Sequence, residues 1–387
     1  MSVDRFARKE LNNLRSAGAR ARGGIIESSD TINLGAGDPD FNQPDFIIDA
    51  VSDAMKEGHT HYVFFGDPDL KKAIADYYRK YGVEVDPSQV FITSGGSLGI
   101  FQIFAAILSP GEEVLILDPA YQGYTNPIIY LGGKIKRAKM KKNEKGLFRP
   151  DIENIRKKIT DYTKAVIICN PDNPAGIVYT DDEITAIAEL AVEKDLIIIS
   201  DEVYPEYIWS ERKHIPIINK PGMAERNFIL GSFSKIFAWT GCRTGYIIAG
   251  PELSGLLNKV PTGNLETPVP FQKAGVVALE QGWAFVEEMR QEYKKRIEYS
   301  VKRLNEMPGI KCVQPEATFY LFPDISELGI SSQKFVEGLY KEEKIRIFPG
   351  SNYGPNSKGH VRLSLVKPVD VLTEVFDRIE RYVKKIQ

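Results

Sequence analysis

Short runs of apolar residues alternate with helix-like patterns through the middle of the chain. The runs that indicate buried strands lie at residues 90–93, 114–117, 165–169, 196–200, 228–231 and 245–249. Helical periodicity fills several of the gaps, as at residues 98–108 and 182–194. Strands that are apolar on both faces and separated by helices are typical of a mainly parallel sheet. The pattern therefore predicts an α/β fold.

The pattern changes towards the C-terminus. Residues 271–307 form one long helical pattern. After it come strand-like segments and helical segments, at 319–322 and 361–365 and at 332–342 and 369–385 respectively. This order predicts a second, smaller α+β domain, against which the N-terminal segment packs. We expect a large domain over residues 44–275 and a small domain made of residues 1–43 and 276–387.

Composition excludes several classes of protein. Apolar residues make up 43% of the 387 positions and charged residues 26%, which is typical of globular chains and not of disordered ones. Fifty Lys and Arg against 52 Asp and Glu leave a net charge of −2, so no overall field attracts nucleic acid. No apolar run approaches the roughly 18 residues of a membrane span. We expect neither nucleic acid nor a membrane as a partner.

Cysteine and histidine usage points to the cytoplasm. The three cysteines are widely separated, and none of the four histidines has metal-ligand spacing. This favours a reducing compartment over a disulfide framework or a metal site. Residues 1–23 are basic and loosely resemble a transit peptide, but their two acids and few serines favour a solvated helical arm.

The first of several polar strand ends is a glycine-rich turn. In an open α/β sheet, ligands bind beyond the carboxyl ends of the strands. Residues 94–97 read Ser-Gly-Gly-Ser between a strand and a helix, where free N–H groups attract an anion such as phosphate. The spacing is not Gly-x-Gly-x-x-Gly, which disfavours a dinucleotide. By itself, such a turn often connects a strand to a helix without binding any ligand.

Further strand ends carry side chains that suit one cofactor. Tyr121 and Asn173 each follow an apolar run, and Asp201 follows another, where an unpaired carboxylate would be costly to bury. Lys235 comes after the next strand, with Arg243 eight residues later. Desolvation and nearby cations lower the pKa of such a lysine and make it nucleophilic. A phosphate cradle, a lysine, an acid and a stacking ring together indicate pyridoxal 5'-phosphate.

The order of the motifs resembles the class I/II aminotransferases, the fold-type-I, aspartate-aminotransferase-like enzymes that use this cofactor. The motifs are Ser-Gly-Gly-Ser, Pro-Ala-Tyr, Asn-Pro-Asp-Asn-Pro-Ala-Gly, Ser-Asp-Glu-Val-Tyr, Gly-Ser-Phe-Ser-Lys and Val-Arg-Leu-Ser. The likeness runs from Leu34 to Arg362 and so covers most of the chain. It implies a mainly parallel, seven-stranded type of sheet in a large cofactor-binding domain, beside a smaller α+β domain.

The resemblance implies a role for each matched residue around the cofactor ring. Lys235 resembles the lysine that forms a Schiff base with the cofactor and then shuttles the substrate proton. Asp201 would pair with the pyridine nitrogen and keep it protonated. Asn173 and Tyr204 would hydrogen-bond the phenolic oxygen of the ring, and Tyr121 would stack on its face.

The resemblance also implies the residues at the two ends of the site. The phosphate would be held by the glycine-rich turn and two later residues, which together are Gly95, Gly96, Ser97, Ser232 and Arg243. Arg362 resembles the arginine that clamps the substrate α-carboxylate, with Gly37 closing over it and with Tyr121 and Asn173 nearby. Tyr62 resembles the tyrosine that reaches into the neighbouring subunit's site, which implies a homodimer.

The chain departs from the family pattern near the pocket. Cys242 stands where tryptophan is common, and Ala317 and Thr318 replace the usual Gly-Ala. No departure removes a group that the cofactor needs, but specificity does not transfer by analogy. No second cation that must bind a substrate side-chain carboxylate is identifiable. Phe64, Phe65, Tyr121 and Tyr124 lie in segments associated with the pocket, which leaves an aromatic or apolar amino donor open.

We expect an aminotransferase that moves an amino group between an L-amino acid and a 2-oxo acid in two half-reactions through Lys235. A C–S β-lyase on the same fold is the alternative. A non-catalytic effector-sensing module is more remote, since the 33 residues before the resemblance cannot hold a winged helix. The sequence does not name the amino donor.

Overall fold

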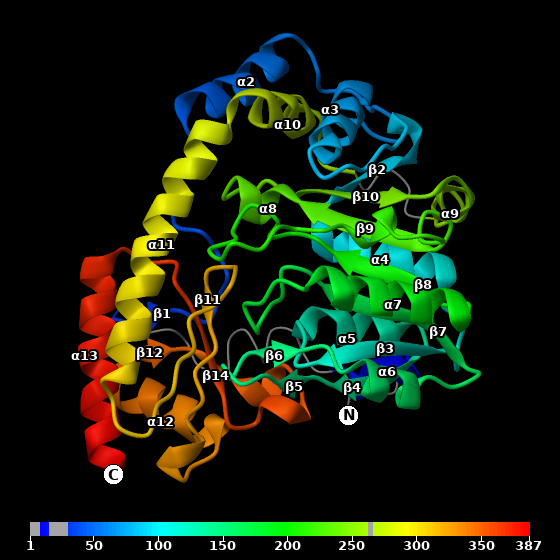
Figure 1. Cartoon of the computed structure of the whole chain (residues 1–387). Coiled ribbons are helices and arrows are strands. Elements are labelled where there is room, and N and C mark those ends of the chain that lie inside the picture. Colours follow the sequence, from blue (N-terminus) through cyan, green and yellow to red (C-terminus); the bar gives the residue numbers. More distant parts are fainter. Residues whose placement is uncertain (1–7, 15–29, 262–265) are drawn as a thin grey trace, which may run out of the picture.

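The computed structural model describes residues 8–14, 30–261 and 266–387. Their largest sheet has seven strands in the order β2-β10-β9-β8-β7-β3-β4 (Figure 1). The strands are β2 (Val90–Ser94), β3 (Glu113–Asp118), β4 (Lys134–Lys139), β7 (Thr163–Cys169), β8 (Ile197–Asp201), β9 (Asn227–Ser232) and β10 (Thr244–Ala249). β10 is antiparallel to both of its neighbours, and the other pairs are parallel. The predicted α/β fold with a mainly parallel sheet is confirmed.

The hydrophobic pattern did not predict one strand of this sheet. β4 lies at the edge, reads Lys-Ile-Lys-Arg-Ala-Lys and buries only Ala138 fully. Lysines on an edge strand discourage pairing with another chain, so an edge strand lacks the apolar run that marks the central ones. The six predicted strands are all present, each within two residues of its predicted ends.

Helices cover both faces of the sheet. The helices of this unit are α2 (Asp45–Lys56), which packs on α10 and not on the sheet, and α3 (Pro68–Arg79), α4 (Gly96–Ile107), α5 (Thr125–Tyr130), α6 (Ile152–Lys158), α7 (Asp181–Glu193), α8 (Phe233–Ile236), α9 (Pro251–Leu257) and α10 (Val269–Gln281). Alternate residues of β3 point to opposite faces. Leu115 and Leu117 pack with α6 and α7, whereas Val114 and Ile116 pack with α4. The sheet is therefore buried on both sides, and its strand ends remain as the place for a site.

The predicted long helix over residues 271–307 is wrong, because two helices take its place. α10 ends at Gln281 and α11 (Trp283–Asn305) begins after Gly282. A Cβ on Gly282 would lie 2.5 Å from the carbonyl oxygen of Ala278 and 2.8 Å from the ring of Phe237. The chain turns at Gly282 because a residue with a side chain would not fit there. The apolar periodicity continues on both sides of the turn, so the pattern did not reveal it.

A smaller unit lies beside the large sheet, along the second half of α11 (Figure 1). Its elements are β1 (Ile32–Asn33), β11 (Tyr320–Leu321), α12 (Ser332–Glu343), β12 (Ile345–Arg346), β13 (Phe348–Pro349), β14 (Val361–Ser364) and α13 (Val369–Ile386). β1 pairs in parallel with β12, so N-terminal residues join a sheet made far along the chain. α11 contributes Tyr293 to the core of the larger unit and Leu304 to that of the smaller one.

The remaining elements are short. They are β5 (Lys141–Lys142), β6 (Phe148–Arg149) and 3-10 turns at Lys9–Asn13, Pro87–Gln89, Gln122–Tyr124, Ile217–Asn219, Ser326–Leu328, Gly350–Asn352 and Pro355–Ser357. The predicted helical arm at residues 1–23 lies mostly outside the described residues. Within the described ranges, none of the helices has the length and apolar character that crossing a bilayer requires.

Candidate active site

A cavity of about 570 Å³ lies at the carboxyl ends of the sheet strands, closed on its other side by β14 and the segment around residue 36. It is lined by all of the predicted site residues except Gly95 and Tyr62, namely Gly37, Gly96, Ser97, Tyr121, Asn173, Asp201, Tyr204, Ser232, Lys235, Arg243 and Arg362. A larger hollow of about 810 Å³ beside α2, α3 and α10 contains none of them. These eleven residues, spread over positions 37 to 362 of the chain, thus meet in the smaller cavity.

Lys235 lies in α8, the single helical turn that follows β9. Its Nζ donates a hydrogen bond to the backbone oxygen of Gly37. Burial lowers the pKa of Lys235 to about 8; Asp38 opposes this effect, whereas Arg362 and Arg243 add to it. A substantial fraction of the amine is therefore neutral near pH 8, and a neutral amine is both a nucleophile and a base.

Asp201 ends β8 and is 5% exposed. Its Oδ2 accepts a hydrogen bond of 2.6 Å from the hydroxyl of Tyr124, and its Oδ1 has no partner among the described residues. Burial raises the pKa of Asp201 to about 6. A buried acceptor without a partner is costly, and a protonated pyridine nitrogen would satisfy it. The carboxylate therefore fits the ring of pyridoxal phosphate.

Tyr124, which the sequence places in a segment associated with the pocket, is a partner of Asp201 that was not predicted. It lies three residues after Tyr121, at the end of the 3-10 turn Gln122–Tyr124, and its ring packs edge-on against that of Tyr121 at 5.3 Å. The spacing places both rings on one side of the turn. The three-residue spacing could have predicted this position, because it directs Tyr124 to the same side as Tyr121.

Four other buried side chains that line the cavity form a hydrogen-bonded group. Asn173 Nδ2 donates to the hydroxyl of Tyr204 at 3.3 Å, and Arg362 donates to Asn173 Oδ1 at 3.2 Å. The hydroxyls of Tyr204 and Tyr320 lie 2.9 Å apart. Tyr320 lies in the strand-like segment predicted at residues 319–322 but was not predicted as a site residue.

The glycine-rich turn lies at the start of α4, where free N–H groups face the cavity. Gly95 has φ of +78°, and a Cβ there would lie 2.2 Å from a guanidinium nitrogen of Arg243. Arg243 Nη1 donates to Thr240 O at 2.7 Å. A Cβ on Gly245 of β10 would lie 2.7 Å from the Gly96 nitrogen, so this unpredicted glycine lets β10 approach the turn. The result is a concave, positively charged end that suits a phosphate.

The opposite end of the cavity is formed around Arg362 of β14, which is 4% exposed. Arg362 donates to the backbone oxygen of Gly35 and, at 3.3 Å, to Ser364 Oγ, while its Nε has no partner among the described residues. A Cβ on Gly37 would lie 2.0 Å from the Tyr320 hydroxyl, so only glycine fits there. A buried guanidinium with a free N–H suits a carboxylate.

Three neighbouring aromatic residues stay outside the cavity. Tyr62 is 76% exposed, and Phe64 and Phe65 are each 65% exposed. Phe64 and Phe65 line a different hollow, next to β2 and β10. Within one chain, none of these three residues reaches Lys235 or Arg362.

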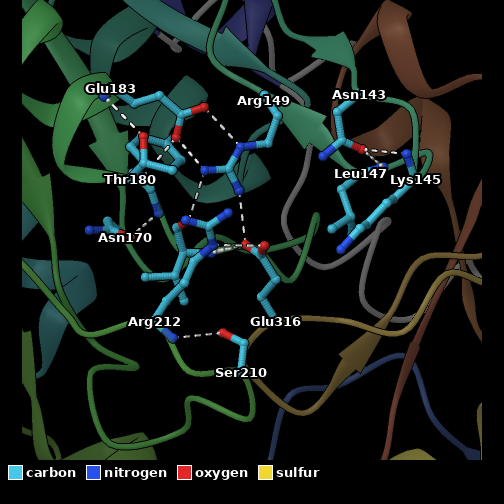
Figure 2. A network of polar contacts seen from close by, with 12 residues as sticks. Asn143, Lys145, Leu147, Arg149, Asn170, Thr180, Glu183, Ser210, Arg212 and Glu316 are labelled. Carbon is cyan, nitrogen blue, oxygen red and sulfur yellow. Dashed lines mark hydrogen bonds and ion pairs between the residues drawn. The ribbon is translucent and has the colours of Figure 1, made fainter.

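An ion-pair network centred on the buried Arg149 of β6 links α7 to Glu316, four residues before Tyr320 (Figure 2). Arg149 bonds Glu316 at 2.8 Å on one side and Glu183 on the other. Arg212 bonds the second oxygen of Glu316 at 2.9 Å. The backbone nitrogen of Glu316 also donates to Gly176 O at 2.7 Å. Glu316 therefore ties the chain just before Tyr320 to the larger unit.

Comparison with known proteins agrees with this geometry. Residues 29–379 match the model of the family described as aminotransferase class I and II. The chain belongs to this family. It is a pyridoxal-phosphate-dependent aminotransferase, and the C–S β-lyase alternative has no better support.

Individual relatives are similar over nearly their whole length. An aspartate aminotransferase of Pyrococcus abyssi is 39% identical over 92% of each chain. An aromatic-amino-acid aminotransferase of Thermococcus litoralis is 38% identical, also over 92% of each chain. The solved structure of an aromatic aminotransferase from Pyrococcus horikoshii superimposes with a TM-score of 0.88 and 37% identity, over 94% of this chain and 98% of that one.

Proposed function

We propose that the protein transfers the amino group of an L-α-amino acid to a 2-oxo acid with Lys235 as the cofactor-binding and proton-transferring residue. The observation that carries this proposal is the position of the Lys235 amine, whose pKa is lowered by burial, in the same cavity as the free oxygen of Asp201 and the guanidinium of Arg362. These three groups match the amine, ring and carboxylate chemistry of the reaction.

The residues around the cavity would hold the cofactor at several points. Asp201 Oδ1 would accept from the pyridine nitrogen, and Asn173 and Tyr204 would donate to the phenolic oxygen. Tyr121 would lie against the ring. The phosphate would be held by Gly95, Gly96, Ser97, Ser232 and Arg243. When bound, pyridoxal phosphate provides a sink for the electron pair of the broken substrate Cα–H bond.

Three residues of the chain would act on the substrate. Arg362 binds the α-carboxylate with two parallel hydrogen bonds and so fixes the direction of the Cα–H bond. Lys235 in its neutral form takes the proton from Cα and delivers it to the cofactor side, then reverses the transfer with the 2-oxo acid. Gly37 would lie next to the carboxylate, and a side chain there would strike the hydroxyl of Tyr320.

The substrate side chain meets a largely uncharged surface. The cations that line the described part of the cavity are Lys235, Arg243 and Arg362, and each has a role above. No lining cation remains to pair with a side-chain carboxylate, whereas Phe348 and Ile100 contribute apolar surface. We therefore infer that this chain prefers donors with aromatic or apolar side chains.

Two measurements test the proposal. Borohydride reduction of the yellow holoenzyme followed by peptide mapping should place the label on Lys235, and a label on another lysine would overturn the assignment. A panel of L-amino acids assayed with 2-oxoglutarate should give a higher kcat/KM for phenylalanine or leucine than for aspartate. A higher value for aspartate would overturn the donor preference but not the role of Lys235.

The proposal includes a homodimer in which Tyr62 reaches the partner's site. The exposed run of Tyr62, Phe64 and Phe65 supports it, because adjacent exposed aromatic rings mark contact surfaces. Mixing and refolding inactive Lys235→Ala with impaired Tyr62→Ala chains should restore activity, since a hybrid dimer has one site with both native residues. No restoration, or a fully active monomer by sedimentation, would contradict the shared site.

The domain division at residues 44–275 and the cytoplasmic location belong to the same proposal. The pairing of β1 with β12 supports the first, and three free cysteines support the second. Limited proteolysis that cuts first within residues 44–260, or recovery of the protein with extracellular fractions, would count against them.

A further inference from the structure

The proposed function gives no role to the hydroxyl of Tyr320. Tyr320 belongs to β11 and is 2% exposed. Its hydroxyl lies 2.9 Å from that of Tyr204, and its ring lies 4.4 Å from the guanidinium carbon of Arg362. The Glu316 network holds the chain four residues before it, and Thr318 N donates to Tyr207 O at 2.7 Å. Tyr320 is therefore held rigidly between two groups of the site.

The neighbours fix which way the hydrogen bonds run. Arg362 can only donate, so the oxygen of the Asn173 amide faces it and the NH₂ group faces Tyr204. The hydroxyl oxygen of Tyr204 thus accepts one hydrogen bond from Asn173. A phenol oxygen accepts two hydrogen bonds and donates one. One acceptor position and one proton of Tyr204 remain.

The direction between the two hydroxyls follows from what each can otherwise reach. Tyr204 is the one hydrogen-bond partner of the Tyr320 hydroxyl among the described residues. If Tyr204 donated to Tyr320, Tyr204 would have no proton left for the cofactor and one of its acceptor positions would stay empty, while Tyr320 would turn its own proton into the cavity that both residues line. If Tyr320 donates, both acceptor positions of Tyr204 are filled. The proton of Tyr204 then points to the cavity, where the phenolic oxygen of the cofactor would receive it.

We propose that Tyr320 is a positioning residue that donates to Tyr204 and thereby aims the Tyr204 proton at the cofactor. This inference rests on the role proposed for Tyr204. An oxygen that accepts two hydrogen bonds makes its own O–H a stronger donor. That donor stabilises the negative phenolic oxygen, and it does so most in the deprotonated form of the bound cofactor, where no other proton is shared with this oxygen. It therefore lowers the pH midpoint of the cofactor's visible absorption change.

Other ionisable groups near Tyr204 and Tyr320 would also change the pH midpoint of the cofactor absorbance. Arg362, Tyr121 and Cys169 face Tyr320, and Asp201 and Cys169 face Tyr204. Burial raises the pKa of Tyr320 to about 12, and burial also raises the pKa of Tyr204 well above its usual range. Both phenols stay protonated over the range in which the cofactor titrates. Their effect is therefore one of hydrogen-bond direction and not of their own ionisation.

The test is a pH titration of the visible absorbance of purified holoenzyme. Tyr320→Phe keeps the ring against Arg362 and removes only the hydroxyl. We expect its midpoint to rise by about half a pH unit, and that of Tyr204→Phe to rise by more. The double variant should match Tyr204→Phe, because Tyr320 acts only through Tyr204. In Tyr320→Phe, kcat should fall about three- to fivefold with the donor KM unchanged.

Tyr353→Phe is the matched control. Tyr353 is fully buried, its ring lies 5.1 Å from the same guanidinium, and its hydroxyl has no hydrogen-bond partner in the described part of the chain. Its removal should leave the midpoint unchanged.

The possible failures are distinguishable. An unshifted midpoint in Tyr320→Phe beside a shifted one in Tyr204→Phe would overturn the role of Tyr320 alone. No shift in either would overturn the proposed role of Tyr204. A raised donor KM without a midpoint shift would mean that Tyr320 contacts the substrate carboxylate instead. An additive double variant would show that Tyr320 acts independently of Tyr204, which also contradicts the proposal.

Discussion

The two sides of the active-site cavity are built by different means. The sheet side consists of residues that end a strand or follow one within four positions, namely Tyr121, Asn173, Asp201, Ser232 and Lys235. The opposite side consists of residues 35–37, Tyr320, Phe348 and Arg362. On the sheet side, register alone sets the spacing, as where Cys169 pairs with Asp201. On the opposite side, Arg362 reaches Gly35 across 327 positions of sequence.

This difference predicts different consequences of substitution. The sheet side is held by seven hydrogen-bonded strands, so a near-isosteric change there should remove chemistry and leave the fold intact. The opposite side depends on individual ties such as the Glu316 network, so changes there should alter binding, positioning or stability. Four substitutions, taken from the largest expected effect to the smallest, examine this contrast.

Lys235→Ala should reduce turnover by at least about 10⁴-fold, because it removes both the nucleophile and the proton-transfer group. Cofactor should still bind through the phosphate end of the cavity, which dialysis and absorbance would measure. Lys273→Ala is the control, since Lys273 pairs with Asp67 and Asp69 outside the cavity and should keep its activity. Wild-type turnover in Lys235→Ala would refute the assignment.

Asp201→Asn should lower kcat by about two to three orders of magnitude, the scale of losing one preorganised electrostatic partner. Its fold should persist, because the amide is almost isosteric with the carboxylate. Steady-state kinetics and circular dichroism measure the two properties. Loss of the fold together with activity would contradict the view that the sheet side is robust.

The same residue gives a pH-dependent prediction for the cofactor-free protein. The pKa of Asp201 is about 6 in the folded chain against 3.8 ordinarily, so the folded state holds a proton that the unfolded state has released. The resulting contribution is present below about pH 4 and is lost as pH rises through 6. Between pH 4 and 7, wild type should therefore lose about 2–3 kcal/mol of stability relative to Asp201→Asn. Urea unfolding at both pH values measures it, and a constant difference would contradict it.

Arg362→Lys keeps the charge but loses the planar fork. Losing one charge-assisted hydrogen bond should lower kcat/KM by about 10- to 150-fold. The loss should be similar for two donors with unlike side chains, because both present the same α-carboxylate. If one donor is affected and the other is not, Arg362 binds the substrate side chain, and the substrate lies in the opposite orientation to the one proposed here.

Glu316→Gln should have the smallest effect on chemistry and a measurable one on stability. It leaves Arg149 and Arg212 without their shared carboxylate, and Arg149 is only 6% exposed. We expect a loss of about 2 kcal/mol in unfolding free energy, with kcat/KM reduced less than tenfold. Glu327→Gln breaks an exposed pair with Lys311 and should cost under about 1 kcal/mol. Equal losses in the two variants would show that Glu316 is not a structural tie.

The predicted helices and strands were most accurate where burial imposes a simple period. The central strands are apolar throughout because both of their faces are covered, so each leaves a run that the pattern detects. The edge strand β4 and the break at Gly282 were missed for the opposite reason. Solvent allows lysines along β4, and a close contact with Phe237, far away in sequence, determines the turn at Gly282.

The sequence by itself determined the α/β fold, the family and the set of polar residues at the strand ends. It did so because parallel strands bring their carboxyl ends to one edge, so residues such as Asp201 and Lys235 converge once the strands are recognised. Only the tertiary structure decided that Tyr124 bonds Asp201, that Tyr320 meets Tyr204 and that Tyr62 stays outside its own cavity. These relations depend on how separate units pack side chain against side chain, and no local period in the chain encodes that packing.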